Sequence, residues 1–324
     1  MTPAVAGAPE PAAPSTAGAW PPLPLDGWRD TYATIHRLTQ MVGKTRLALC
    51  PFENHWWHCA LYVTSRGLST SPMPVGGGRT CEITFDFVDH RLVAFCSDGE
   101  ARAIPLTARS VSQFFLDYLA MLRELGVEAH IRPVPSEIPD AVPFLDDAHA
   151  AYDPDAARRC WQVLVQVDSA MKRFRGYFLG KSSPVHFWWG AFDLACTRFS
   201  GRTAPRHPGG IPNLPDYVAV EGYSHECISA GWWPGGGAVD GPAFYAYAYP
   251  EPAGCPQAAV RPAQAYYHPV LHEWVLPYDV VRTAADPDAV LQEFLQSTYA
   301  AAANLGGWDR LALERRPAAE VGRT

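Results

Sequence analysis

Apolar residues recur with helical spacing in two long segments of the chain. Over residues 28–49 (WRDTYATIHRLTQMVGKTRLAL) they return every three or four positions, as on the buried face of a helix. Asp30 is a candidate N-cap and Gly43 a candidate stop, so we expect this helix to end near Gly43. Residues 153–180 have a similar period and open on an Asp-Pro pair that is typical of helix starts.

Each half of the chain is predicted to close with a further helix and to carry strands before it. The closing helices are residues 111–126 and 289–307, which share a Phe-Leu start and a Leu-Gly end. Apolar and polar residues alternate over 81–99, which predicts a hairpin with Asp89 near its turn. Strand-like patterns in the second half cover residues 223–233, 242–252 and 272–281.

Two Trp-Trp pairs follow the two long helices and suggest an internal duplication. HWWHCALYVTSRG and FWWGAFDLACTRFSG are both predicted as strands, with Trp56 matching Trp188 and Arg66 matching Arg198. Because helix, Gly-Lys, Trp-Trp strand and closing helix recur in one order, we expect an internally duplicated α+β fold. It would contain two antiparallel sheets, each packed by helices.

Proline and aspartate mark the predicted boundary between the halves. We divide the chain into a disordered Ala/Pro-rich tail (1–19), an N-terminal lobe (20–135), a linker (136–153), a C-terminal lobe (154–315) and a tail (316–324). Residues 201–222 form another irregular stretch, predicted as a lid, a crossing loop or a plain insertion.

Composition narrows the classes of protein. The chain is 48% hydrophobic with a formal net charge of −7, which argues against nucleic acid as a partner. No run of about 18 apolar residues is present, so we expect no membrane span. The eight cysteines stand singly and are predicted to be reduced thiols in the cytoplasm. Eleven Trp, 14 Tyr and 14 Phe suit both a core and an aromatic pocket.

The stretch CPFENHWWHC, residues 50–59, could be a metal knuckle or a strand. A knuckle needs a second pair of ligands at matching spacing, and the chain has none. As a strand, the segment would point alternate side chains to opposite faces. We therefore expect only a single histidine from it to reach a binding site, and we choose His58.

The second half carries the main candidate site. If residues 185–201 form one strand, His186, Trp188 and Arg198 share a face and Asp193 lies on the other. Two histidines and a carboxylate can bind Fe(II) or Zn²⁺ and leave coordination positions open. The candidate ligands are His186, His225 and Glu226.

Two other interpretations of these polar residues stay open. The histidines could be hydrogen-bonded structural groups, with Glu226 paired to Arg198. Alternatively, His225 could act as a metal-free general base that is oriented by Glu226 or Asp193.

The quoted segments, together with YSHECISAGWWPGG and AFYAYAYPEP, resemble a bacterial family known as domain of unknown function 5996. The resemblance covers about residues 20–315. It implies a soluble protein whose folded unit is the whole two-lobed chain, and it implies no activity.

Two functions are therefore predicted for one aromatic-lined pocket. The first is a metal-assisted, oxidative enzyme acting on a small organic substrate, with Trp188, Trp232 and Tyr247 as walls and Arg198 as an anion anchor. The alternative is a non-catalytic protein that binds a small molecule between the same walls. A third reading, a structural partner in a complex, needs an exposed apolar patch.

Overall fold

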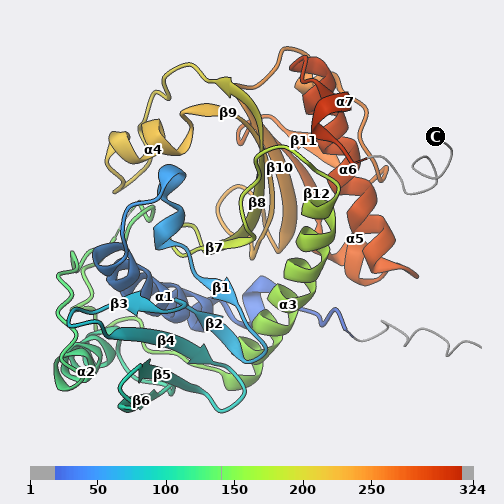
Figure 1. The fold of residues 1–324 in the computed structure, drawn as a ribbon. Coiled ribbons are helices and arrows are strands. Elements are labelled where there is room, and N and C mark those ends of the chain that lie inside the picture. Colours follow the sequence, from blue (N-terminus) through green and yellow to red (C-terminus); the bar gives the residue numbers. More distant parts are fainter. Residues whose placement is uncertain (1–18, 140, 316–324) are drawn as a thin grey trace, which may run out of the picture.

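The computed structural model describes residues 19–139 and 141–315, and both predicted tails lie outside these ranges, apart from Ala19. The described chain is an α+β protein with two antiparallel sheets of six strands (Figure 1). This confirms the predicted fold class. Each half runs from a long helix through a sheet to a closing helix.

The first half builds one sheet and packs it with helices (Figure 1). Its strand order is β1-β2-β4-β5-β6, with β3 paired to β4. The predicted hairpin is formed by β4 and β5, and Asp89 lies in its turn. The elements are η1 (Leu25–Gly27), α1 (Arg29–Leu49), η2 (Asn54–Cys59), β1 (Tyr62–Val63), β2 (Gly67–Ser69), β3 (Met73–Pro74), β4 (Thr80–Asp86), β5 (Arg91–Cys96), β6 (Ala101–Pro105) and α2 (Val111–Glu124).

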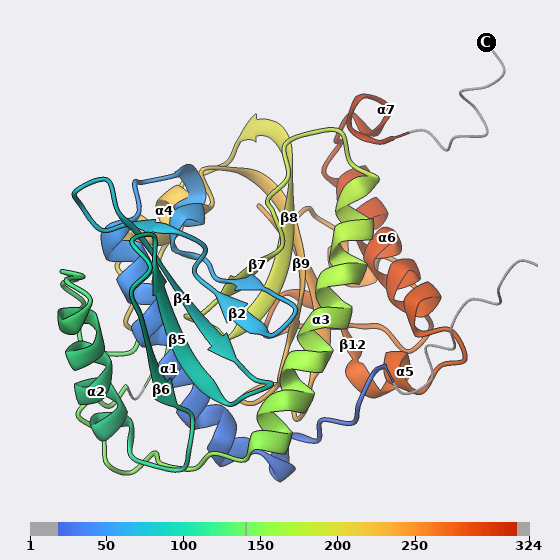
Figure 2. The same ribbon diagram turned by 60° about the horizontal axis from the view of Figure 1, so that its bottom comes forward.

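The second half builds the other sheet in the order β11-β12-β10-β9-β8-β7. Its helices α3 and α6 pack on one face of that sheet (Figure 2). The elements are α3 (Pro154–Gly176), β7 (His186–Trp188), β8 (Asp193–Thr203), α4 (Asp216–Gly222), β9 (His225–Trp233), β10 (Ala243–Tyr249), η3 (Cys255–Gln257), β11 (Tyr266–His268), β12 (Glu273–Pro277), α5 (Tyr278–Arg282), α6 (Pro287–Leu305) and α7 (Arg310–Leu313).

The two lobes share one core. Leu61, just before β1, exchanges backbone hydrogen bonds of 3.0 and 2.9 Å with Phe187 of β7. One hydrophobic cluster runs from Met41 in α1 to Phe294 in α6. The predicted linker 136–153 contains no helix or strand in its described part, and Asp153 caps α3 as the Asp-Pro pair predicted.

The predicted end of the first helix was wrong. α1 continues through Gly43 to Leu49. A Cβ atom at Gly43 would overlap the indole of Trp189, so the glycine permits close packing of a helix on a tryptophan and does not stop the helix.

The first Trp-Trp pair lies in a helical turn where a strand was predicted. η2 has left-handed backbone at His55 (φ 58°) and Trp56 (φ 62°), whereas the second pair begins in β7. The two pairs thus occupy different kinds of element, although both halves keep the order helix, sheet, helix. The internal duplication stays a prediction.

Candidate functional site

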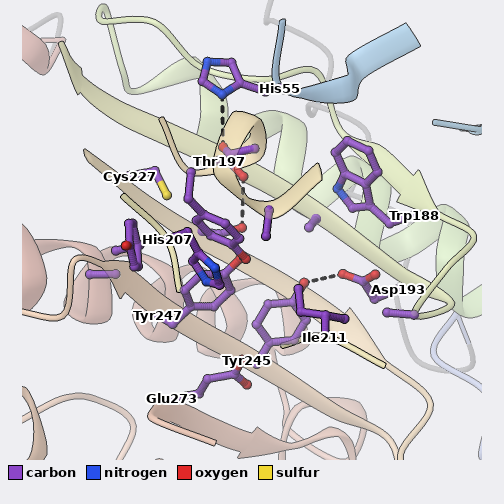
Figure 3. A pocket seen from close by; sticks show the side chains of 18 of the residues that line it. His55, Trp188, Asp193, Thr197, His207, Ile211, Cys227, Tyr245, Tyr247 and Glu273 are labelled. Carbon is purple, nitrogen blue, oxygen red and sulfur yellow. Dashed lines mark hydrogen bonds between the residues drawn. The ribbon is translucent and has the colours of Figure 1, made fainter. Parts of the chain in front are cut away.

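A cavity of about 730 Å³ lies on the face of the second sheet that α3 and α6 leave uncovered. Side chains alternate between the two faces of a strand, and the residues of β8, β9 and β10 that line the cavity are odd-numbered apart from Ala248. The other walls come from η2, from Glu137, and from residues within 188–191, 207–223, 250–251 and 271–273. Figure 3 shows these side chains converging from separate parts of the chain.

Three tyrosines on β10 form the floor of the cavity. In AFYAYAY, Tyr245, Tyr247 and Tyr249 all face it, while Phe244 and Ala246 are buried on the other side of the sheet. The rings of Tyr245 and Tyr247 are stacked, with centroids 6.1 Å apart and planes 18° apart. The period-two pattern of this strand therefore produces a continuous aromatic surface.

Indole rings form the side walls. Trp188 and Trp233 reach the cavity from the sheet, and Trp56 and Trp57 reach it from η2. The left-handed backbone of η2 turns these rings toward the sheet, and Trp56 Nε1 donates a 3.1 Å hydrogen bond to the carbonyl of Val218 in α4. Non-glycine residues in this backbone region carry strain that is often found at functional sites.

The segment of residues 201–222 borders the cavity as its cover. Ile211, Leu214 and Val218 line the cavity from this segment. His207 stacks on Tyr223 with ring centroids 4.7 Å apart. Among the interpretations open from the sequence, the structure therefore fits a segment that covers a pocket.

Besides Glu251, which is paired with His272, three carboxyl groups face the cavity, namely those of Glu137, Asp193 and Glu273 (Figure 3 labels the last two). Burial raises the pKa of each to about 7. The negative charge of Glu137 further raises the pKa of Asp193, and that of Asp193 raises the pKa of Glu273. These groups can therefore take up or release a proton near neutral pH.

Asp193 and Tyr245 form a hydrogen-bonded pair at the sheet (Figure 3). The tyrosine hydroxyl donates to Asp193 Oδ2, which partly offsets the effect of burial on the carboxyl pKa. To reach Asp193, the Tyr245 ring crosses Gly231 on β9, where a Cβ atom would overlap its hydroxyl group. Glycine is therefore needed at this position.

Glu137 is held in place by the residue before it in the predicted linker. Gln40 in α1 receives a 2.6 Å hydrogen bond from Ser136 N and donates a 2.9 Å bond to Ser136 O. The Glu137 N–H donates to Pro212 O at 3.0 Å, which ties the linker to the cover. The left-handed backbone of Glu137 (φ 64°) places its carboxyl group against Gly190.

The opposite end of the cavity is marked by His55 (Figure 3). Its Nδ1–H donates to the carbonyl of Gly222 at 3.0 Å, and its Nε2 accepts from Lys181 Nζ at 2.8 Å. Burial is the main cause that lowers the pKa of this imidazole. His55 is therefore a neutral structural link between η2 and the cover.

The structure does not bring the three predicted metal ligands together. Strand pairing sets His186 level with Gly231, and the six residue steps along β9 from Gly231 to His225 span about 20 Å. Glu226 is paired with Arg202 at 2.6 Å. Across residues 19–139 and 141–315, no group of three or more His, Cys, Asp or Glu side chains is placed to hold a metal ion.

The predicted facing of Asp193 and Arg198 was wrong, because residues 186–203 form two strands and not one. The turn between them pairs Trp188 with Asp193, so odd-numbered residues of β8 share the face of Trp188. Arg198 is fully buried on the helix side, where it donates to Phe174 O and lies 3.5 Å from the centroid of the Phe174 ring. It cannot anchor a ligand in the cavity.

Two further wall residues differ from expectation. Trp232 is fully buried on the helix side, and its neighbour Trp233 lines the cavity in its place. His58 does not line the cavity; its Nδ1 accepts a 3.2 Å hydrogen bond from Glu53 N. Trp188 and Tyr247 do line the cavity.

The family comparison agrees with this architecture. A model described as a family of unknown function (DUF5996) matches residues 20–315. Both lobes and every residue of the cavity lie within that match, and the chain belongs to this family. A search of curated proteins and a search of solved structures found no match. In the described residues, no helix has the length and apolar character that crossing a membrane requires.

Proposed function

We propose that this protein binds a small organic molecule in the cavity on the tyrosine face of the second sheet. The observation that carries the proposal is the lining itself. Stacked tyrosines, four indoles and four carboxyl groups surround about 730 Å³, within the usual size of small-molecule sites. Rigid rings supply apolar contact area, and the few polar groups fix the ligand's orientation.

An enzyme is a second candidate, supported by Asp193. Its raised pKa near 7 and its bond to Tyr245 suit a group that exchanges a proton with a ligand at neutral pH. Asp193 thereby keeps the catalytic role expected from the sequence. Glu226 is less suited to it, because it is paired with Arg202 and does not line the cavity.

Metal-assisted oxidation remains a proposal that would need other ligands than the three first chosen. Metal analysis of untagged protein, alongside His186→Ala and His225→Ala, tests it. A full equivalent of iron or zinc that both substitutions abolish would restore the first ligand set.

We also propose a cytoplasmic location without nucleic-acid contact, supported by eight free cysteines and a net charge of −7.

Binding can be tested with thermal shifts against a metabolite panel, because a ligand that binds only the folded state raises the melting temperature. Hits are then titrated by tryptophan fluorescence. Trp188→Ala, which removes a cavity wall, is expected to weaken binding by about tenfold or more. The control Trp308→Ala alters an indole outside the cavity and is expected to leave affinity unchanged. No hit, or equal losses in both variants, would contradict the proposal.

A further inference from the structure

Carboxyl groups give the cavity an acidic lining. Four carboxyl groups line it, those of Glu137, Asp193, Glu251 and Glu273, and no lysine or arginine does. Of these groups, Glu251 is paired with His272 at 2.9 Å. The remaining three give the cavity a negative charge whenever they ionise.

These three carboxyl groups have few partners in the part of the chain that is described. Asp193 accepts a hydrogen bond from Tyr245. Glu137 and Glu273 have neither a hydrogen bond nor an ion pair through their carboxyl groups within residues 19–139 and 141–315. The positive charge of Lys44 lowers the pKa of Glu137, but its Nζ donates to Ser136 Oγ at 2.8 Å and does not line the cavity. A buried carboxylate without a partner is costly unless a cation enters beside it.

The carboxyl groups are also set among aromatic faces. Asp193 pairs directly with Trp188 across β7 and β8. β10 and β12 pair Tyr245 with Val275 and Ala246 with Trp274. Continued by one residue, this register sets Glu273 beside Tyr247. Aromatic faces attract organic cations through the negative charge of the ring face. The carboxyl groups and the aromatic rings therefore both favour an organic cation in this part of the cavity.

We propose that the ligand of the cavity is an organic amine, bound as its ammonium form with the charged nitrogen between Asp193, Glu273 and Glu137. This inference rests on the proposed function and specifies its ligand class. A primary ammonium group offers three N–H donors to carboxylate acceptors. The tyrosine floor and indole walls contact the apolar body of the molecule. The three carboxyl groups come from separate segments of the chain, namely the segment before α3, β8 and β12.

Calorimetric titration with three probes of matched shape tests the charge preference. The probes are phenethylamine, 2-phenylethanol and 3-phenylpropionate, titrated at pH 7.5 and constant ionic strength. Phenethylamine is expected to bind at least about tenfold more tightly than the alcohol, because only the amine meets the carboxylates with a charge. The carboxylate probe is expected to show no binding. Equal or tighter binding of the alcohol or the carboxylate, or no binding of the amine, overturns the inference.

Two matched variants locate the effect. Glu273→Gln preserves shape and removes one charge, and it is expected to lower phenethylamine affinity about tenfold or more without changing alcohol affinity. Glu128→Gln makes the same change at an exposed position outside the cavity and is expected to change neither. Equal losses in both variants overturn the assignment. If neutral or anionic metabolites bind at Trp188 while amines do not, this inference fails and the proposed function stands. If no metabolite binds, both fail.

Discussion

Asp193→Asn is expected to stabilise the protein at alkaline pH. Asp193 is buried, and within residues 19–139 and 141–315 Tyr245 is the one side chain that donates a hydrogen bond to it. Asparagine has nearly the same shape, and its carbonyl oxygen can still accept that bond. The substitution therefore removes the cost of a buried charge and leaves the packing in place.

The size of the effect follows from the pKa of Asp193, which burial raises from 3.8 to about 7. Each pKa unit corresponds to about 1.4 kcal/mol, so the ceiling is about 4 kcal/mol. Well below pH 3.8 the carboxyl group is protonated in both the folded and the unfolded chain. As the pH rises from 4 to 7, the unfolded chain releases this proton first, and the folded state loses stability relative to it. Above pH 7 the full cost is present.

Urea denaturation of parent and variant from pH 4 to pH 8.5 measures this difference. The free energies of unfolding should agree near pH 4, and the variant should exceed the parent by up to about 4 kcal/mol at pH 8.5. Asp240→Asn, at an exposed position, is expected to follow the parent at every pH. A variant less stable than the parent at pH 8.5, or a gap that does not change with pH, would refute the reasoning. Glu137 and Glu273 titrate in both proteins, and because the charge of Asp193 raises the pKa of Glu273, the difference between the proteins includes this coupling.

Three further substitutions test how the cavity is built. Gly43→Ala forces a methyl group against Trp189 and is expected to lower the free energy of unfolding by about 1–3 kcal/mol; a gain in urea denaturation would contradict the packing argument. Gly231→Ala displaces Tyr245 from the sheet and is expected to reduce amine affinity in calorimetry while the circular dichroism spectrum stays unchanged; unaltered affinity would count against the placement of Tyr245. Arg198 lies on the helix side of the sheet, so Arg198→Met should leave the dissociation constant of a cavity ligand within about twofold of the parent value. A large loss of affinity would indicate that Arg198 contributes to the binding site.

Periodicity was enough to predict most elements of the fold. Apolar residues at helical spacing located α1, α2, α3 and α6 because these helices bury one face against a sheet. Alternation located β10, where each tyrosine of AFYAYAY faces the cavity and Phe244 and Ala246 are buried on the helix side. The predictions failed where tertiary contacts decide the backbone. Gly43 continues a helix because Trp189 packs on it, and η2 takes a left-handed turn that no local pattern indicated.

The candidate site was harder to predict than the fold. One hairpin turn after Trp188 inverts the facing of every later residue in β8, which moved Asp193 into the cavity and Arg198 out of it. Glu137 lies in a segment that has the composition of a linker, and hydrogen bonds between Ser136 and Gln40 and from Glu137 to Pro212 hold it beside the sheet. A single sequence does not report such long-range pairing. The alternating tyrosines were the one local signal for the cavity floor.

The central claim is that the tyrosine face of the second sheet holds an organic amine. A crystal structure of the protein grown with saturating phenethylamine tests it most directly. We predict density for the probe over Tyr245 and Tyr247, with its nitrogen within hydrogen-bond distance of Asp193 or Glu273. Probe density at another surface, with none in the cavity, would contradict the account.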